Sequence, residues 1–345
     1  MTSSSNSIPA AADWLDDLRA SGAVIDATRV VHFGDPDAEL AALTAAPTLH
    51  PLADWSILRA AGTDATAFLQ GQLSNDIGML DASHAQLSTY CTAQGRMLAT
   101  VLVWRDAPDY FLQLPAEIAG AVRARLQKHI LRSAVTLADA TPHLRVLGLG
   151  GPGASAALAG LVDLPPAAPM AIARGPEVTV IRVHEQELFA IVVAVRHWSS
   201  VWKRLTGLAR PAGTDGWRWR LIRAGIPVVT AATQEQFVPQ MANLEQLGAV
   251  SFDKGCYPGQ EIVARAQYRG EVKRRLFRLH APDAAPAAGQ PVFQPGEGAA
   301  CGMVVNAAPA PGGGFDLLAV SSTNAAEAGD LRLGGPDGPV LRVCR

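Results

Sequence analysis

The spacing of apolar positions in residues 54–139 predicts an alternation of strands and helices. Alternating or continuous apolar runs indicate strands, whereas apolar positions three and four residues apart indicate helices. Strands are predicted over residues 54–60, 87–91, 97–104, 109–114 and 135–139, and helices over 65–70 and 116–131. A turn at residues 93–96 joins the second and third of these strands as a hairpin. This order indicates an α+β domain with a mostly antiparallel sheet.

A second series of elements is predicted in residues 144–206. Its strands cover residues 145–149, 178–183 and 188–193, and its helices cover 154–161 and 201–206. This order is typical of a small ferredoxin-like layer. The glycines around Pro152 resemble a dinucleotide-binding loop, but the proline interrupts the motif and no acidic residue follows at the required distance. We therefore expect no nucleotide site here.

The two ends of the chain carry different patterns. Trp14, Leu15 and Leu18 predict a short helix over residues 12–23, and the prolines in 47–51 predict a loop. A turn is expected at Gly270, and after it short alternating runs between Pro and Gly clusters indicate a small β-barrel or sandwich. The predicted domains are an N-terminal extension (1–50), a first α+β lobe (51–143), a ferredoxin-like lobe (144–215), a segment returning to the first lobe (216–273) and a C-terminal β-barrel (274–345).

Composition narrows the class of protein. The chain has 345 residues, 49% hydrophobic and 17% charged, which is enough for two or three folded cores. Its formal net charge of −2 gives no general electrostatic footprint for nucleic acid. No apolar run approaches the roughly 18 residues of a membrane span, and the polar start Met1–Ser7 resembles a frayed tail rather than a secretory signal. We expect a cytoplasmic monomer that binds neither membranes nor nucleic acid directly.

The four cysteines lie far apart, without CxxC or CxxH spacing, so neither a zinc framework nor a disulfide scaffold is expected. One of them, Cys256, lies within the polar stretch Lys254–Glu261, where Gly255, Pro258 and Gly259 predict a turn. Cys256 is either a small buried hydrophobic residue or a reactive thiol at a loop tip. The nearby cation of Lys254 favours a thiolate, so we prefer the second interpretation.

Three segments together resemble one known family. Residues 68–76, 239–245 and 252–261 are similar to the signatures of folate-binding YgfZ-type proteins, and Arg265, residues 268–270 and residues 273–274 continue the last of them. That family is related to the T-protein (aminomethyltransferase) of the glycine cleavage system, and the resemblance runs from about residue 51 to the end. It implies a three-lobed cloverleaf, with two α+β (ferredoxin-like) lobes and a C-terminal β-barrel around a central folate channel. It also implies assembly or repair of iron–sulfur proteins as partners and, through them, support of tRNA modification.

The resemblance also implies a site for tetrahydrofolate or a related folate. Trp55 and Trp217 match tryptophan positions that suit a flat pterin, although both could equally be core aromatics. The polar residues Asn75, Gln240 and Asn243 could bind the pterin edges or cap backbone groups. Tyr257 is also predicted to be a folate-binding residue.

Arg223 departs from the family pattern. It stands where T-proteins carry a carboxylate, and a guanidinium accepts no hydrogen bond. Either Glu245 replaces that carboxylate or the folate binds differently.

We hypothesise that Cys256 performs redox exchange or touches an iron–sulfur cluster transiently, with Lys254 favouring its thiolate. A single cysteine cannot hold a cluster, which typically takes four thiolates, so no permanent metal is expected. The residues that support the motif are predicted to be Gly255, Gly259, Gln260, Glu261 and Arg265.

T-proteins also carry an acidic pair after the early hairpin turn, where this chain has Gly95–Leu98, so aminomethyl transfer is disfavoured. Two alternatives stay open: a tetrahydrofolate-dependent aminomethyltransferase or demethylase, and a non-catalytic module that recruits partners.

Overall fold

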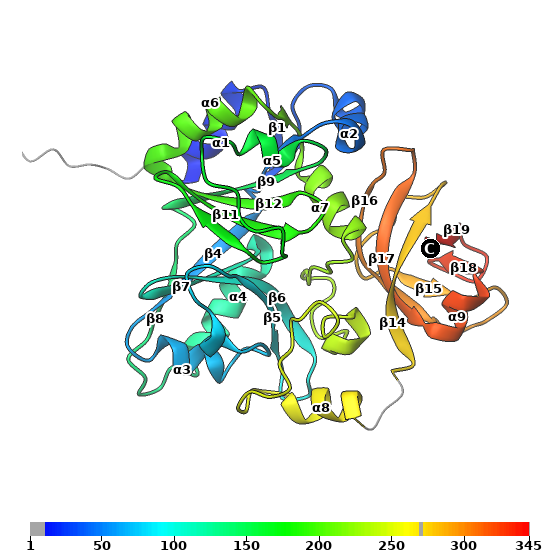
Figure 1. The fold of residues 1–345 in the computed structure, drawn as a ribbon. Helices are drawn as coiled ribbons and strands as arrows, with labels where there is room; N and C mark the ends of the chain where they lie inside the picture. The colour runs from blue at the N-terminus through cyan, green and yellow to red at the C-terminus, as the bar shows by residue number, and fades with distance from the viewer. Residues whose placement is uncertain (1–10, 269–271, 345) are drawn as a thin grey trace, which may run out of the picture. The chain divides into compact units, whose positions relative to one another are not determined.

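The computed structural model describes residues 11–268 and 272–344, so the predicted tail Met1–Ser7 and the predicted turn at Gly270 lie outside the described residues. Figure 1 shows a mixed α+β chain. It divides into two compact units, one of residues 1–58 and 139–217, the other of residues 59–138 and 218–345. The predicted division into five segments stays a prediction. Among the described residues, no helix has both the length and the hydropathy needed to cross a bilayer.

The first unit is built on a six-stranded sheet with the order β10-β11-β12-β9-β3-β13. Its strands are β3 (Thr48–Pro51), β9 (Leu144–Gly150), β10 (Ile172–Arg174), β11 (Val178–His184), β12 (Leu188–Ala194) and β13 (Arg210–Pro211). All the pairs are antiparallel except β3 with β13. The predicted strands at 145–149, 178–183 and 188–193 are therefore confirmed.

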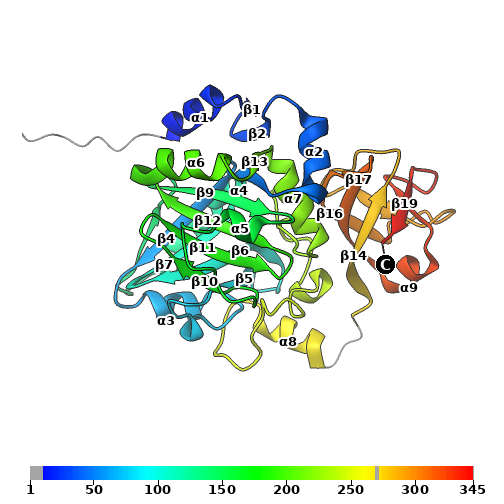
Figure 2. The ribbon, with the colours of Figure 1, turned by 45° about the horizontal axis from the view of Figure 1, so that its top comes forward.

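Helices cover one face of this sheet, as Figure 2 shows for α1 (Ala11–Ala20) and α6 (Trp198–Thr206). Trp14 of α1 meets Trp198 of α6 edge-on, with ring centroids 5.5 Å apart. These rings join the buried leucines and valines of β9, β11 and β12 in one core. The same unit contains α2 (Pro36–Ala45), α5 (Ala154–Ala157), α7 (Thr214–Arg223, shared with the second unit) and the hairpin of β1 (Val24–Asp26) with β2 (Arg29–His32).

The predicted loop at residues 47–51 is wrong. Residues Thr48–Pro51 form strand β3, which pairs with β9, and all four of its residues are buried. His50 stays inside because its Nδ1 lies 2.8 Å from the carbonyl oxygen of Gly213. The histidine and the two prolines in this segment are typical of a loop, but the buried His50 imidazole has an internal hydrogen-bond partner, so the segment can form a buried strand. The predicted helix 154–161 is also shorter, because α5 ends at Ala157.

The second unit begins with a five-stranded sheet of order β5-β6-β7-β4-β8. Its strands are β4 (Trp55–Ala61), β5 (Gln86–Cys91), β6 (Met97–Asp106), β7 (Asp109–Pro115) and β8 (Thr136–Asp139), and its helices are α3 (Ala65–Gln70), η1 (Ile77–Met79) and α4 (Ala116–Gln127). The predicted hairpin is confirmed, and the eight residues of β6 from Met97 to Trp104 are all buried. Helix α4 buries Ile118, Val122 and Leu126 on one face but ends before the predicted residue 131.

The C-terminal part of the second unit is a closed barrel of order β14-β17-β16-β15-β18-β19. This confirms the barrel and excludes the sandwich. Its elements are β14 (Arg274–Ala281), β15 (Pro291–Phe293), β16 (Gly302–Pro309), β17 (Phe315–Ser322), α9 (Thr323–Ala328), β18 (Leu331–Leu333) and β19 (Val340–Val343). Leu279, Val304 and Leu341 lie in its fully buried interior. Two further elements, η3 (Pro239–Ala242) and α8 (Gln260–Tyr268), precede the barrel.

Replacing Leu279 by Ala should destabilise the barrel by about 2–5 kcal/mol, because it removes buried methyl groups and leaves a cavity. Leu131→Ala is the matched control, since Leu131 is 89% exposed and should change the unfolding free energy by less than about 0.5 kcal/mol. Urea unfolding of both variants measures the difference. Equal midpoints for the two variants would contradict the assigned core.

Candidate functional site

Lys254 anchors the loop of residues 254–261. Its Nζ donates to the carbonyl oxygens of Gln70 and Leu73, both at 2.6 Å, and of Asn75 at 3.0 Å. Lys254 is only 8% exposed, and an ammonium group has three protons to donate. The lysine therefore ties the cysteine loop to the segment that follows α3, about 180 residues earlier in the chain.

Tyr257 forms the second buried group of the loop. Its ring centroid lies 5.2 Å from the Lys254 ammonium, a cation–π contact. Burial raises the pKa of the Tyr257 hydroxyl, so it stays neutral. Burial also lowers the pKa of Lys254 to about 8, although the charge of Asp76 opposes this shift. The anchoring role of Lys254 was not predicted from the sequence, and its predicted effect on the Cys256 thiol stays a prediction.

Gly259 fixes the other end of the loop. Its φ is +82°, and a Cβ added there would lie 2.5 Å from the Cα of Gly95 and from the carbonyl oxygen of Thr92. The loop thus lies directly on the hairpin turn between β5 and β6, where only glycine fits without displacement. After Gly259 the chain enters α8, and the first residue of α8, Gln260, reaches back to the Lys254 carbonyl at 3.5 Å.

Cys256 lies between these two anchors and is exposed. Cys91 provides the contrast within the same unit, because it is buried and its burial raises the pKa of the thiol to about 12. Cys256 is therefore accessible to a reactant or a partner, whereas Cys91 is not. Among residues 11–268 and 272–344, no cluster of three or more His, Cys, Asp or Glu side chains could hold a metal ion.

Two of the predicted amides hold backbone segments together. Asn75 Nδ2 donates to the carbonyl oxygens of Leu87 at 2.8 Å and Gly248 at 2.7 Å. Asn243 has a φ of +54°, and its Nδ2 donates to the carbonyl oxygen of Leu276 in β14 at 3.0 Å. Both amides thus serve the capping role that sequence analysis left open.

Gln240 and Glu245 meet at Arg275, the second residue of β14. Arg275 Nη1 pairs with Glu245 Oε1 and donates to the Gln240 carbonyl at 3.0 Å. Gln240 is fully buried, and its Nε2 donates to the carbonyl of Val263 at 2.6 Å. Glu245 Oε2 and Gln240 Oε1 are buried and have no hydrogen-bond partner among the described residues. Two acceptors remain here for donors that a ligand could supply.

The remaining predicted residues of the second unit are on its surface. Arg223 ends helix α7 and is exposed, with its guanidinium 5.8 Å from the ring centroid of Trp219. Glu261 and Arg265 are exposed on α8, and Gly255 is exposed next to Cys256. No contact between Arg223 and the Glu245 carboxylate is present among the described interactions.

The two predicted tryptophans are in the first unit. Trp217 is buried, its ring covers Gly148 of β9 so closely that a side chain there would collide with it, and its Nε1 has no partner among the described residues. Trp55 is half-buried at the start of β4, whose residues 55–58 belong to the first unit and whose residues 59–61 belong to the second. The assignment of both rings to a pterin stays a prediction.

The predicted residues of the second unit form two groups. Lys254, Cys256, Tyr257 and Asn75 belong to the anchored loop, and Gln240, Asn243 and Glu245 surround the start of β14. The bond from Gln240 to α8 joins the groups. Arg275 was missed, because the basic run at the start of β14 gives no signal of which arginine turns inward.

Comparisons with known proteins agree with this architecture. The profile of the GCVT N-terminal domain matches residues 33–253. A protein named tRNA-modifying protein YgfZ from Escherichia fergusonii is 35% identical over 233 residues, which cover 67% of this chain and 71% of the relative. The protein of the same name from Escherichia coli O157:H7 is 34% identical with the same coverage.

The solved structure of glycine cleavage system aminomethyltransferase T from Bartonella henselae has the same fold. It superposes with a TM-score of 0.78, covering 96% of this chain and 95% of that one, at 18% sequence identity. The profile match covers more than half of the chain, and the relatives exceed 30% identity over more than two thirds of their length. The chain therefore belongs to the GCVT-domain family and, within it, to the YgfZ proteins.

Proposed function

We propose that this protein is a tetrahydrofolate-binding accessory factor that supports tRNA modification by assisting iron–sulfur proteins, with Cys256 as its functional thiol. The proposal is supported by relatives named tRNA-modifying protein YgfZ and by the GCVT domain. The observation that carries it is the exposure of Cys256 between two rigid anchors. We expect the protein to act as a cytoplasmic monomer with iron–sulfur client or assembly proteins as partners.

The chemistry at η3 and β14 fits a folate. The aminopyrimidine edge of a pterin presents N–H donors, and Glu245 Oε2 and Gln240 Oε1 are buried acceptors without partners. Glu245 would thus supply the carboxylate that the family's T-proteins have at the position of Arg223. A bound tetrahydrofolate would contribute one-carbon or reducing chemistry, and the residues named here would hold and orient it.

The anchored loop supports a role in exchange with a partner. A loop tip is normally the most variable part of a fold, but here a buried ammonium and a backbone contact fix both ends. Cys256 can therefore be presented in one position without ordering the loop at each encounter. It offers one of the roughly four thiolates that a cluster takes, so the partner must hold most of any cluster that it touches.

The second candidate function is a tetrahydrofolate-dependent aminomethyltransferase or demethylase, and the likeness in fold to an aminomethyltransferase favours it. The hairpin turn weighs against it, because Arg96 occupies the region where T-proteins have acidic residues and donates to the carbonyl of Gln236 at 2.7 Å. A partner-recruiting module without folate is the third candidate.

Titration of the purified protein with tetrahydrofolate, followed by tryptophan fluorescence, should show saturable binding that Cys256→Ser leaves unchanged. The thiol is exposed on its loop, whereas the proposed acceptors lie elsewhere, Gln240 in η3 and Glu245 shortly after it. Absence of binding would favour the partner-recruiting module. Formation of methylene-tetrahydrofolate from an aminomethyl donor would favour the transferase.

Cys256→Ser should abolish rescue of iron–sulfur enzyme activity in a strain that lacks this protein, because serine cannot exchange disulfides and is a poor ligand for iron. Cys301→Ser is the matched control, since Cys301 is a half-buried thiol of the barrel. Enzyme activity and tRNA modification are measured in the same cells. Full rescue by Cys256→Ser would falsify the thiol hypothesis.

Lys254→Met should destabilise the protein by about 1.5–3 kcal/mol, because three carbonyls lose a charged donor. Lys273→Met, at an exposed lysine, should have an effect below about 0.5 kcal/mol. Limited proteolysis of the loop reports the local effect. An unchanged cleavage rate at residues 254–261 would show that the lysine does not hold the loop.

Comparison of the wild type with Lys254→Met also gives a prediction for the pH dependence of stability. Since the pKa of Lys254 is about 8 when folded, against an ordinary value of 10.5, the unfolded chain binds more protons between these values. The unfolding free energy of the wild type should therefore rise relative to Lys254→Met as the pH increases from about 8 to 10.5. Urea unfolding at several pH values measures this, and a constant difference would contradict the lowered pKa.

A further inference from the structure

The segment that follows α4 exposes a leucine in an unfavourable backbone conformation. Leu131 is 89% exposed, the largest value among the exposed large hydrophobic residues that the structure describes. Its φ is +45°, and it is the second residue of a tight turn in which the N–H of Ser133 donates to the carbonyl oxygen of Ile130 at 2.8 Å. Glycine, asparagine and aspartate dominate such a turn position, because a Cβ disfavours a positive φ. Neither burial nor backbone preference within this chain therefore accounts for a leucine here.

Basic side chains flank this leucine. Lys128, His129 and Arg132 are all exposed, and none of them forms an ion pair or a side-chain hydrogen bond with another of the described residues. Asp64 contacts the same segment, but its Oδ2 accepts a hydrogen bond from a backbone N–H there, at 2.7 Å. The basic turn, defined as Lys128, His129, Leu131 and Arg132, thus presents cations without a described ion-pair partner around one apolar side chain.

The dipole of helix α4 accounts for only part of this charge. Cations in the last turn of a helix stabilise its carbonyl end. Arg125 lies in that turn, and it also hydrogen-bonds to the hydroxyl of Tyr90 on β5, so it has a partner within the unit. Arg132 lies more than one helical turn beyond Gln127, the last residue of α4, where the dipole has little effect. Its charge is therefore available to a partner of the chain.

One apolar side chain inside a rim of cations is typical of a protein–protein interface. Binding energy there concentrates in a few side chains that enter pockets, and charges around them select the partner and speed association. A nucleic acid would pair with the cations but leave the leucine in water, and the formal net charge of −2 gives no wider basic surface. A lipid surface would bury the leucine, but stable attachment requires a larger apolar face or a second anchor. An acidic protein with an apolar pocket fits both features.

We propose that the basic turn docks on an acidic protein partner, in which Leu131 fills an apolar pocket and Lys128 and Arg132 face carboxylates at its rim. Docking removes the leucine side chain from water, which is favourable. The hydrogen-bonded turn already holds this residue in place, so little conformational entropy is lost on binding. The assignment of the partner as an iron–sulfur protein rests on the proposed function.

Photo-crosslinking in cells that produce this protein tests the docking surface. With photoreactive benzoylphenylalanine in place of His129, we expect an adduct to a protein whose cross-linked peptide is rich in Asp and Glu. Adding Lys128→Glu together with Arg132→Glu should reduce the adduct roughly tenfold, because like charges then face each other. Leu164 is the control position, since it is a 47% exposed leucine without a neighbouring cation, and benzoylphenylalanine there should give no such adduct.

Leu131→Asn separates binding from folding. Asparagine tolerates a positive φ, so this variant should keep or raise the urea unfolding midpoint. It removes the apolar side chain, however, and should reduce the adduct from position His129 roughly tenfold.

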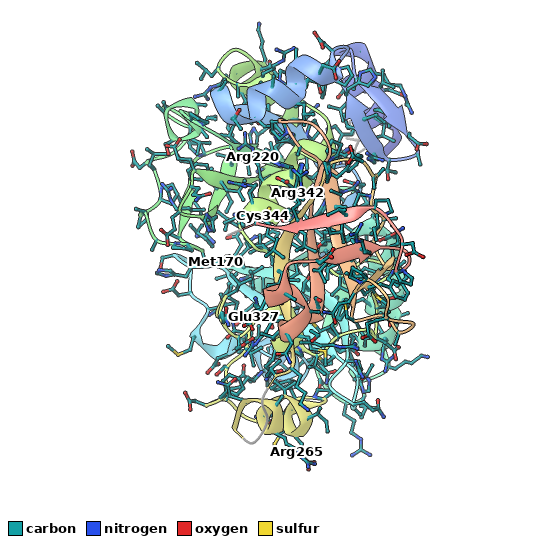
Figure 3. The ribbon with its side chains drawn as sticks, turned by 90° about the vertical axis from the view of Figure 1, so that its right-hand side faces the viewer. Met170, Arg220, Arg265, Glu327, Arg342 and Cys344 are labelled. Carbon is teal, nitrogen blue, oxygen red and sulfur yellow. The ribbon has the colours of Figure 1, made fainter. Side chains whose placement is uncertain are left out.

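Arg342→Glu is the matched control for charge reversal. Figure 3 shows Arg342 on β19, where it is exposed and forms no ion pair with another of the described residues. This variant should leave the adduct unchanged. Urea unfolding of every variant verifies that it is folded.

Four results would overturn the inference. They are the absence of a protein adduct, an adduct to RNA or lipid instead, an adduct that neither charge reversal at Lys128 and Arg132 nor Leu131→Asn weakens, and a lowered unfolding midpoint of Leu131→Asn. The last result would show that the leucine serves the fold.

The same variants distinguish this inference from the proposed function. In the strain that lacks this protein, Lys128→Glu with Arg132→Glu should lower the rescued iron–sulfur enzyme activity and leave tetrahydrofolate binding unchanged. If rescue requires Cys256 but no charge-dependent adduct forms, the docking surface is rejected and the proposed function stands. If the adduct behaves as expected but the charge-reversed protein rescues fully, the surface stands and its link to iron–sulfur proteins is rejected.

Discussion

The buried ammonium of Lys254 is the interaction on which the candidate site depends. Removing a cation from water is costly, and the hydrogen bonds to three backbone carbonyls offset that cost in part, since burial still lowers the pKa of Lys254 to about 8. The same bonds give a donor to three carbonyl oxygens, one at the last residue of α3 and two in the segment that follows it. Because these bonds form only when both segments are in place, the lysine couples the folding of the cysteine loop to that of the end of α3 and the segment after it.

A close backbone contact at Gly259 fixes the other end of the loop that Lys254 anchors. Gly259 lies so close to the hairpin turn at Gly95 that the loop has no room to shift toward it, and Tyr257 fills the space beneath Lys254. The residue left between these contacts is Cys256. Its exposure is thus a consequence of how the flanking residues are buried, because Lys254 and Tyr257 turn inward on either side of it. The turn and the exposed thiol are thus encoded in the same eight residues.

Elements with clear periodicity could be predicted from the sequence, and elements held by polar contacts could not. The continuous apolar run of β6 and the short strands of the barrel follow from pattern alone. Strand β3 was missed because His50 and its prolines look like a loop until the partner carbonyl at Gly213 is known. The loop residues of the site could be named from the motif, but the role of Lys254 depends on carbonyls about 180 residues away, and no local pattern reports such a partner.

The second unit contains one buried thiol, Cys91, and one exposed thiol, Cys256, close to the same hairpin. Cys91 ends strand β5 of the hairpin, and Cys256 belongs to the loop that contacts the hairpin turn; burial raises the pKa of Cys91 to about 12 and keeps it protonated, whereas Cys256 is open to solvent. A reactant that reaches this region therefore meets one thiol. The buried acceptors Gln240 Oε1 and Glu245 Oε2 are a second feature of this unit. A buried acceptor without a hydrogen-bond partner is stabilised when a ligand supplies the missing donor. Because Gln240 also bonds to α8, the helix that begins at the end of the cysteine loop, a ligand at these acceptors would act on an element continuous with the thiol.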